Sequence, residues 1–418
     1  MILNQQMRSG TANTHNRAKP PPLSPLDEAD GSPANNTPDR FLFPPRWSDE
    51  HRNRSAFTHT SMSHLGPDRF QRGRGAASNT SGRFESQQRT HEDDGWNSLA
   101  DESSLNTNVT LETPQRIISW NNSPDMPFDR SINPYRGCEH GCVYCFARPS
   151  HAFLGLSPGL DFETQLFAKP TAAALLRREL SSPRYTPRPI AMGTNTDPSQ
   201  PIERQYRITR SILEVLEEFQ HPVTILTKSA LIQRDLDILT RMAEKNLVHT
   251  ALSVTTLDPK LARALEPRAS TPTKRMAAVA DLAEAGVPTG VMFAPVIPAL
   301  NDMELERIMD GTQRSGARFG NYVLLKLPRE VAGLFREWLD IHVPDKTAHI
   351  MSLVNAMRQG EDYNSQWFTR TRGNGPYAWL LKRRFDLCVR RLNLNASSCL
   401  LDATRFAPPN QARQMTLL

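Results

Sequence analysis

From Thr113 onward, short apolar runs rich in β-branched residues alternate with longer stretches whose apolar positions recur at helical spacing. The runs that we expect to form strands are residues 116–120, 189–194, 223–228, 249–256, 289–297 and 321–327. The stretches that we expect to form helices between them are residues 171–180, 202–219, 233–245, 271–286 and 302–317. Near-continuous apolar strands that are each followed by a helix are typical of a parallel sheet covered by helices. Six such units can be counted, two short of the closed eight-fold barrel.

The two ends of the chain follow other patterns. The first 112 residues are rich in Pro, Ser, Asn, Arg and Gly and have no sustained apolar period, so they cannot bury enough apolar area to offset their ordering entropy. After the sixth predicted strand the pattern is helical. We therefore divide the chain into a disordered tail at residues 1–112, a core at residues 113–330 and a helical C-terminal extension at residues 331–418.

Three of the five cysteines lie within eight residues, in the sequence CEHGCVYC at residues 138–145. This segment follows the first predicted strand, and α/β proteins place their chemistry at the carboxyl ends of parallel strands. A structural zinc ion takes four ligands, which Cys138, Cys142 and Cys145 would supply only together with His140. A cube of four irons and four sulfides needs only three thiolates when one iron is left open for a substrate or cofactor. We favour the iron–sulfur cluster, with the zinc site as the alternative.

With Tyr144 before the third cysteine, the spacing resembles the CxxxCxΦC signature of the radical S-adenosylmethionine (SAM) superfamily. The resemblance covers roughly residues 113–330 and implies an α/β fold, a partial (β/α)6 barrel of the radical SAM type, flanked by the disordered tail and the helical extension. It implies that Cys138, Cys142 and Cys145 are the metal-binding and catalytic residues, because they hold a [4Fe–4S] cluster whose open iron binds SAM. It also implies that a reductant such as flavodoxin or ferredoxin supplies the electron that splits SAM into a 5′-deoxyadenosyl radical, which abstracts hydrogen from the substrate.

The same resemblance places the contacts to SAM at the carboxyl ends of the following strands. The polar turn after the second strand is where the superfamily commonly holds the SAM amino group, and Lys228 after the third strand is suited to pair with the carboxylate. The expected cofactor-binding residues are Tyr144, Thr194, Asn195, Asp197, Lys228, Ser253 and Arg268, with Thr196, Thr255 and Asn301 as further candidates. Polar residues at strand ends also serve as turn formers and helix caps, which is the alternative for each.

Three stretches narrow the resemblance to one branch of the superfamily. Residues 132–155, GTNTDPSQPIE at 193–203 and LEPRASTP at 265–272 resemble the spore photoproduct lyase-like proteins, whose relatives are often labelled DNA repair photolyase-like. The branch implies a lyase with a nucleic-acid substrate. In the lyase a cysteine just after the second strand returns a hydrogen atom to the product, and Thr194 stands near that place here. A hydroxyl O–H bond is too strong to donate hydrogen readily to a carbon radical, so Thr194 does not suit the role of that cysteine.

Other residues are candidates for the hydrogen donor. Cys388 shares an apolar helical face with Leu381 and Phe385, so we expect it to be a small core residue. The remaining candidates are Cys399 and the tyrosines Tyr135, Tyr144, Tyr322 and Tyr363.

Charge and hydropathy bear on partners and location. Residues 1–112 carry 12 basic and 14 acidic residues, net −2, and the remaining 38 basic and 30 acidic residues give the rest of the chain +8. This basic excess fits a nucleic-acid substrate or merely a solvated basic surface. No segment approaches the ~20 consecutive apolar residues of a membrane span, and we expect a cytoplasmic protein whose clustered thiols stay reduced. Two other hypotheses are a zinc-stabilised nucleic-acid-binding protein without radical chemistry, and a scaffold whose tail recruits partners and can be removed without loss of the cluster.

Overall fold

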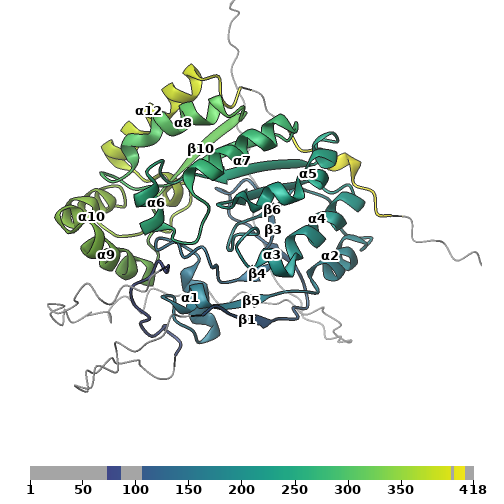
Figure 1. Ribbon diagram of the computed structural model, residues 1–418, viewed down its shortest axis with the longest axis horizontal. Coiled ribbons are helices and arrows are strands. Elements are labelled where there is room, and N and C mark those ends of the chain that lie inside the picture. Colours follow the sequence, from purple (N-terminus) through teal and green to yellow (C-terminus); the bar gives the residue numbers. More distant parts are fainter. Residues whose placement is uncertain (1–72, 86–105, 397–399, 410–418) are drawn as a thin grey trace, which may run out of the picture. The chain divides into compact units, whose positions relative to one another are not determined.

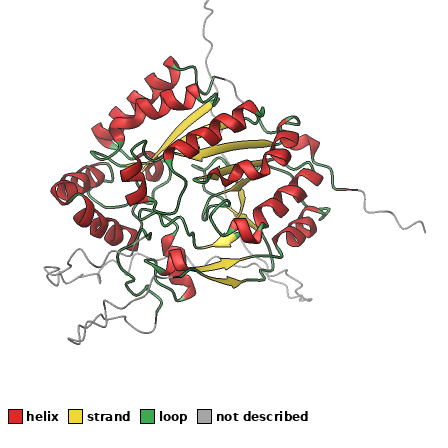
Figure 2. Cartoon of the chain, viewed as in Figure 1, coloured by secondary structure: helices red, strands yellow, loops and turns green. Residues whose placement is uncertain are grey.

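The computed structural model describes residues 73–85, 106–396 and 400–409, and a seven-stranded sheet organises this part of the chain (Figure 1, Figure 2). The strands, in their spatial order, are β10 (Phe319–Leu324), β9 (Thr289–Val296), β8 (Val248–Ser253), β7 (Val223–Thr227), β6 (Ile190–Met192), β3 (Arg130–Ile132) and β2 (Ile118–Trp120). Neighbours from β10 to β3 are parallel, and only β2 is antiparallel to its partner. The predicted α/β class with a six-stranded parallel sheet is therefore confirmed, and β10 and β2 form its two open edges.

The helices follow the order of the strands. The parallel strands are arranged in sequence order, so successive crossovers run in one direction and place their helices on one face of the sheet. Figure 1 shows these helices in succession along an arc, with the strands on its inner side. They are α2 (Ala172–Leu180), α4 (Ile208–Glu218), α5 (Leu236–Ala243), α7 (Pro272–Glu284) and α8 (Leu305–Arg314). The predicted boundaries of α7 are confirmed in detail, since the Thr271 side chain caps its first turn, Pro272 opens it and Gly286 follows its end.

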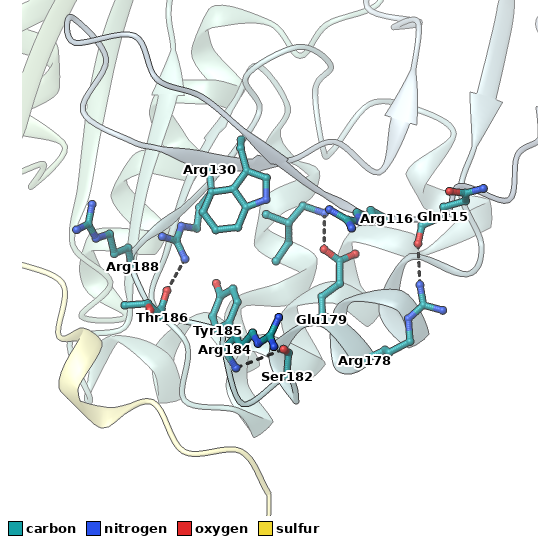
Figure 3. A pocket seen from close by; sticks show the side chains of 12 residues that line it. Gln115, Arg116, Arg130, Arg178, Glu179, Ser182, Arg184, Tyr185, Thr186 and Arg188 are labelled. Atoms are coloured by element: carbon teal, nitrogen blue, oxygen red, sulfur yellow. Dashed lines mark hydrogen bonds between the residues drawn. The ribbon is translucent and has the colours of Figure 1, made fainter. Parts of the chain in front are cut away.

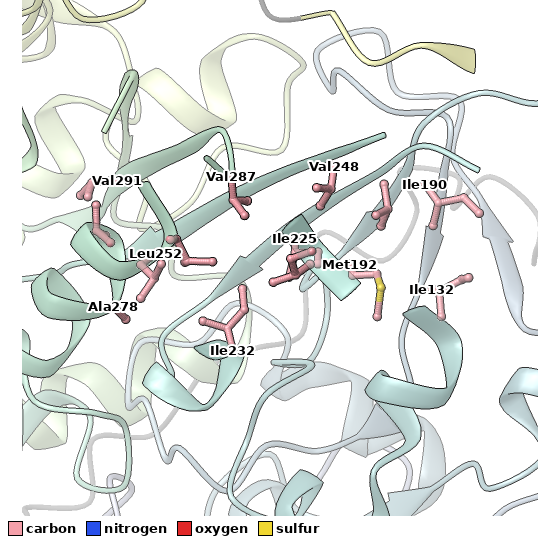
Figure 4. Close-up of a cluster of buried hydrophobic side chains, with 14 of the residues drawn as sticks. Ile132, Ile190, Met192, Ile225, Ile232, Val248, Leu252, Ala278, Val287 and Val291 are labelled. Carbon is pink, nitrogen blue, oxygen red and sulfur yellow. The ribbon is translucent and has the colours of Figure 1, made fainter. Parts of the chain in front are cut away.

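The main core lies between the sheet and these helices. Its side chains come from both the strands and the helices, as Figure 4 shows for Ile225, Leu252, Val291 and Ala278. Each of these four residues is at most 3% exposed. Strands that are covered on both faces are expected to read as continuous apolar runs, which explains why β6 to β9 could be recognised in the sequence.

The first strand of the parallel set is not the one that the sequence predicts. Residues 116–120 contain β2, which is the antiparallel edge strand, and the first parallel strand is β3. This strand is three residues long and begins with Arg130, whose guanidinium lies 4.5 Å from the centre of the Trp120 ring and binds Asp129. A charged residue in so short a strand interrupts the apolar run by which a buried strand is recognised in a sequence. The cysteine segment still follows the carboxyl end of the first parallel strand.

A small second sheet corrects the predicted extent of disorder. It has the order β1 (Asn108–Leu111), β5 (Gln165–Ala168) and β4 (Tyr135–Arg136). Strand β1 and residues 73–85 belong to the stretch that we expected to be disordered, yet β1 is paired along its whole length and Ala76 is 1% exposed. Residues 1–72 and 86–105 of the predicted tail lie outside the described residues.

Three long helices in the C-terminal extension confirm that its pattern is helical. They are α9 (Glu330–His342), α10 (Thr347–Ala356) and α12 (Gly375–Arg391). Helix α9 packs on the cysteine segment from outside, and its buried Trp338 donates a hydrogen bond to the carbonyl of Ala264 at 3.0 Å. Among the described residues, no helix combines the length and the apolar character needed to cross a bilayer.

Candidate active site

The three clustered cysteines lie on the loop between β4 and the 3-10 helix η4 (Arg148–Leu154), beyond the carboxyl end of β3. Cys138 and Cys142 are buried, Cys145 is half-buried, and all three are free thiols. Backbone hydrogen bonds fix the loop, since Cys138 N donates to Phe162 O at 3.0 Å and Val143 N donates to Leu265 O at 3.2 Å. The loop is therefore tied to two different parts of the fold.

The donor set fits an iron–sulfur cluster. Burial raises the pKa of each thiol, and the carboxylates of Asp197 near Cys138 and of Glu266 near Cys142 raise it further. Holding these thiols as thiolates in a buried place near carboxylates is unfavourable, and bound metal cations would offset that cost. Three soft sulfur ligands also suit iron–sulfur chemistry. Within the part of the chain that the structure describes, no three His, Cys, Asp or Glu side chains are grouped so as to hold one metal ion. A cube binds each thiolate to a different iron, so its ligands stand farther apart than those of a single ion.

A buried ion pair supports the loop from behind. Arg148 is fully buried, and its Nε donates to the carbonyl of Cys142 at 2.9 Å while its Nη2 pairs with Glu163 Oε1 at 2.5 Å. Both oxygens of Glu163 also accept backbone hydrogen bonds at 2.9 Å, from Gly75 N and Ala76 N. Residues 73–85 are thus linked through Glu163 and Arg148 to the cysteine loop. The scaffold hypothesis, in which the first 112 residues are dispensable for the cluster, conflicts with these contacts.

Gly75 permits this contact because it has no side chain. A Cβ at position 75 would lie 1.6 Å from the carbonyl oxygen of Gly141, in the middle of the cysteine loop. We expect Gly75→Val to push the two segments apart, to lower the free energy of unfolding by about 1–3 kcal/mol and to reduce the iron bound after reconstitution. Thr80→Ala is the control, because the Thr80 side chain in the same segment is exposed. Full iron content and unchanged thermal stability in Gly75→Val would contradict this description of the contact.

The turn after β6 borders Cys138. Asp197 accepts hydrogen bonds from Thr227 Oγ1 at 2.6 Å and from Lys228 N at 2.7 Å, and it lies 3.4 Å from His140 Nδ1. Burial alone would raise the pKa of Asp197, but His140 and these hydrogen bonds outweigh it and lower the pKa to about 2. Asp197 is therefore a largely buried carboxylate, 9% exposed at its side chain, beside the cysteine loop. Its partners are protein groups, so it joins the ends of β6 and β7.

The other residues predicted in this turn have smaller roles in the described contacts. Thr194 Oγ1 donates to Asn133 Oδ1 at 3.3 Å, and the exposed Asn195 donates its backbone N–H to the same oxygen at 3.0 Å. Thr196 is buried and donates to the carbonyl of Tyr135. Asn133, which precedes the cysteine loop, organises this turn and was not singled out from the sequence.

A second polar group lies where β7 and β8 end. Lys228 Nζ donates to Ser253 Oγ at 2.9 Å, lies 3.9 Å from Glu266 Oε1 and sits 5.7 Å from the centre of the Tyr144 ring. The structure thus brings together three of the predicted cofactor-binding residues. The Lys228 side chain is 17% exposed, and its positive charge lies near Cys142 and Cys145.

Glu266 holds this group together and was missed in the sequence. Its carboxylate is fully buried and binds the hydroxyls of Tyr144 and Thr255 and the guanidinium of Arg275. Burial alone would raise the pKa of Glu266, but Arg275 and then Lys228 lower it to about 2. The signal for Glu266 was present in α7, because Arg275 shares the buried helical face of Ala278, Val279 and Leu282 and a buried cation needs an acidic partner.

Arg268 and His140 lie on the other side of the loop. Arg268 Nη2 pairs with Glu139 Oε1 at 3.0 Å, and its backbone N–H binds the carbonyl of His140 at 3.2 Å. His140 is buried with Nδ1 directed at Asp197. The alternative in which His140 completes a zinc site with the three cysteines receives no support from this arrangement.

Several further candidates are occupied elsewhere. Asn301 is fully buried and binds the backbone of Thr255, Pro295 and Ile297, so it orders the end of β9. Cys388 lies in the core on α12, as predicted. Among the tyrosine candidates, Tyr135 binds Glu203 and Tyr322 packs on Phe385. Cys399 lies outside the described residues.

Comparisons with known proteins agree with the cysteine signature. Residues 132–310 match the family model of the radical SAM superfamily. An uncharacterized protein of Mycobacterium tuberculosis is 39% identical over 220 residues, covering 52% of this chain and 65% of the relative. An uncharacterized protein of Methanocaldococcus jannaschii is 26% identical over 215 residues, covering 51% of this chain and 76% of the relative. The chain therefore spans 65% of the length of the mycobacterial relatives that it matches.

Solved structures agree on the fold. A spore photoproduct lyase variant with bound AdoMet and dinucleoside spore photoproduct has a TM-score of 0.50 at 14% identity, covering 73% of this chain and 85% of that chain. Another variant of the same lyase has a TM-score of 0.50 at 13% identity and the same coverage. The radical SAM family uses a [4Fe–4S] cluster and SAM, and the cysteine loop lies inside the matched residues. Residues 132–310, which include the cysteine loop, thus form a domain that matches the radical SAM superfamily.

Proposed function

We propose that this protein is a cytosolic radical SAM enzyme of the spore photoproduct lyase-like branch, with its cluster on Cys138, Cys142 and Cys145 and a nucleic acid as its substrate. When bound, the cluster and SAM supply a 5′-deoxyadenosyl radical that abstracts hydrogen from the substrate. The observation that carries the proposal is that three free cysteines and the polar group around Lys228 lie at the same edge of the parallel sheet. An electron donor of the flavodoxin or ferredoxin type would serve the cluster.

The chain's own residues divide into binding and supporting groups. Lys228 and Ser253 present an ammonium and a hydroxyl beside the cysteine loop, where they suit the carboxylate and the hydroxyl groups of SAM. The buried carboxylate of Glu266 orients both the Tyr144 phenol and the Lys228 ammonium. Asp197, Thr194 and Asn195 belong to the turn that would face the SAM amino group. Arg268 lies beside the cysteine loop, where it pairs with Glu139. Fixing these groups before SAM binds reduces the ordering cost of binding.

The proposal is tested by chemistry in the absence of oxygen. The protein reconstituted with iron and sulfide, reduced in the presence of SAM, should release 5′-deoxyadenosine. Metal analysis of protein purified without oxygen should find iron and sulfide, whereas zinc alone would favour a binding protein without radical chemistry. A loaded cluster that never yields 5′-deoxyadenosine under reduction would remove the enzymatic proposal.

Lys228→Met should weaken SAM binding without loss of the cluster. A charge-assisted hydrogen bond is worth about 1.5–3 kcal/mol, which corresponds to an affinity about ten- to a hundredfold lower. Equilibrium titration of the reconstituted protein with SAM measures this effect, and Lys228→Arg should recover part of the affinity. Lys260→Met, at an exposed position in α6 (Pro259–Leu265), is the matched control. Equal SAM affinity in Lys228→Met and Lys260→Met would remove Lys228 from the proposed contacts.

The nucleic-acid substrate is supported by the charge of +8 beyond residue 112 and by the fold shared with the lyase. Transfer of deuterium between SAM labelled at its 5′ carbon and candidate oligonucleotides would identify the substrate, and it would report whether the reaction returns hydrogen to the product as a lyase cycle requires. Thr194 donates to Asn133 and carries a strong O–H bond, so we expect Thr194→Ala to leave unchanged the amount of hydrogen returned to the product per 5′-deoxyadenosine released.

A further inference from the structure

A cavity of about 800 Å3 lies at the edge of the sheet formed by β2 and β3. Its walls come from the segment that leads into β2, from the end of α2 and from the residues before β6. We call it the arginine groove, because Arg116, Arg130, Arg178, Arg184 and Arg188 line it together with a single acidic residue, Glu179. Figure 3 shows the labelled arginines spread across the whole width of the cavity, from Arg188 on one side to Arg116 and Arg178 on the other.

Most of this positive charge is not neutralised. Arg130 and Arg188 share the carboxylate of Asp129, and the one partner of Arg178 among the described residues is the backbone carbonyl of Gln115, at 2.7 Å. The guanidinium groups of Arg116 and Arg184 are exposed and have no hydrogen-bond or ion-pair partner among the described residues. The carboxylate of Glu179 is engaged by the backbone N–H groups of Ile117 and Ile118. With Asp129 included, the groove has five cations and two anions.

Aromatic rings stand among these cations. Trp120 is 54% exposed, although the large side chain of tryptophan is usually mostly buried. The Arg130 guanidinium lies 4.5 Å from its ring centre, which holds the indole in place. The half-buried Tyr185 lies on the other side of Arg130, 5.4 Å from the guanidinium carbon to its ring centre. The groove therefore combines a fixed, exposed aromatic surface with free guanidinium groups.

The groove is separate from the candidate active site. Arg130 is the first residue of β3, and Thr186 and Arg188 precede the first residue of β6. The cysteine loop instead follows the carboxyl end of β3. Because β3 and β6 are parallel, the groove borders the amino ends of these strands and the cysteines border their carboxyl ends.

We propose that the arginine groove is a non-catalytic binding site for a single-stranded polynucleotide, with phosphates at Arg116 and Arg184 and a base stacked on Trp120. Guanidinium groups bind phosphate through paired N–H donors, and exposed aromatic rings stack on bases without sequence preference. The spread of the cations suits a chain of several phosphates better than one small anion. A membrane surface is a poorer match, because the lining is dominated by arginines and lacks a cluster of protruding aliphatic side chains. This inference goes beyond the proposed enzymatic function and does not depend on it.

The test is fluorescence anisotropy of a labelled single-stranded oligonucleotide, as DNA and as RNA, with the full-length protein before cluster loading. Arg116→Glu/Arg184→Glu should weaken binding at least about tenfold. It should also lower the slope of log Kd against log salt concentration by about 1.4, the value for two lost phosphate contacts on a single strand. Trp120→Ala should weaken binding roughly five- to a hundredfold through the loss of one base stack. The matched control is Arg307→Glu/Arg314→Glu on α8, which makes the same charge change at two exposed positions and should change binding by less than about twofold.

The outcomes separate this proposal from the enzymatic one. Iron content and release of 5′-deoxyadenosine should be unchanged in the groove variant Arg116→Glu/Arg184→Glu, in the α8 control and in Trp120→Ala. No binding of either oligonucleotide by the wild-type protein, or equal loss of binding in the groove variant and in the α8 control, would overturn the proposal. Binding of phosphatidylserine vesicles that the groove variant loses, with oligonucleotide binding retained, would also overturn it by assigning the groove to a membrane surface.

Discussion

Cys142→Ala is expected to abolish both the visible absorption of the reconstituted cluster and the release of 5′-deoxyadenosine. Cys142 is one of only three cysteines on the loop, and no other described cysteine lies near enough in the sequence or the fold to replace it. Removal of one thiolate leaves a cluster with two protein ligands, which does not survive in water. The remaining fold should persist, since alanine fills most of the volume of a buried thiol.

Iron and sulfide content, visible absorption and product release should be measured on the same anaerobic preparation. Cys388→Ala is the matched control, because Cys388 is also buried but belongs to the core face of α12. That variant should retain the cluster and the activity. A Cys142→Ala protein that binds a complete cluster and splits SAM at the wild-type rate would show that the three cysteines are not the cluster ligands.

Glu266→Gln is expected to cause the largest loss of stability among the polar variants, about 3–5 kcal/mol. The substitution leaves Arg275, which is 1% exposed, without its carboxylate partner. A buried, uncompensated cation costs far more than the loss of a surface ion pair. Glutamine also has only one acceptor oxygen, so it cannot accept from Arg275 at one terminal atom and from the hydroxyls of Tyr144 and Thr255 at the other, as Glu266 does.

Chemical denaturation of the metal-free protein measures this effect directly. Glu214→Gln is the control, since Glu214 is exposed on α4 and pairs with Arg210 at the surface. That variant should change the free energy of unfolding by less than about 1 kcal/mol. Similar, small changes in both variants would mean that the Glu266 network contributes little to the fold.

The strongly patterned parts of the fold could be predicted from the sequence. Strands β6 to β9 contain only buried or half-buried residues and therefore consist of largely apolar runs, and α7 carries both of its boundary signals. The predicted helix at residues 202–219 is instead divided into α3 (Glu203–Tyr206) and α4, because Arg207 adopts a positive φ of 52°. A single residue in the left-handed region leaves the apolar period almost intact, so the pattern does not reveal the break.

The missed features depend on contacts between distant residues. Strand β3 is too short to show a period, and residues 73–85 are held by Glu163, which lies far along the chain. The cysteine spacing is local, and so it could be read directly. The partners of Lys228 and Asp197 could be placed at one edge of the sheet, but their pairing with Glu266 and His140 depends on loop conformations that no local pattern encodes.

The central claim is that one iron of the cluster has no protein ligand and binds SAM directly. Electron–nuclear double resonance of the reduced, reconstituted protein with SAM labelled by 15N at its amino group and by 17O at its carboxylate measures this contact. We expect both labelled nuclei to couple to the cluster spin. A complete cluster that shows no coupling to either label at saturating SAM would contradict the account.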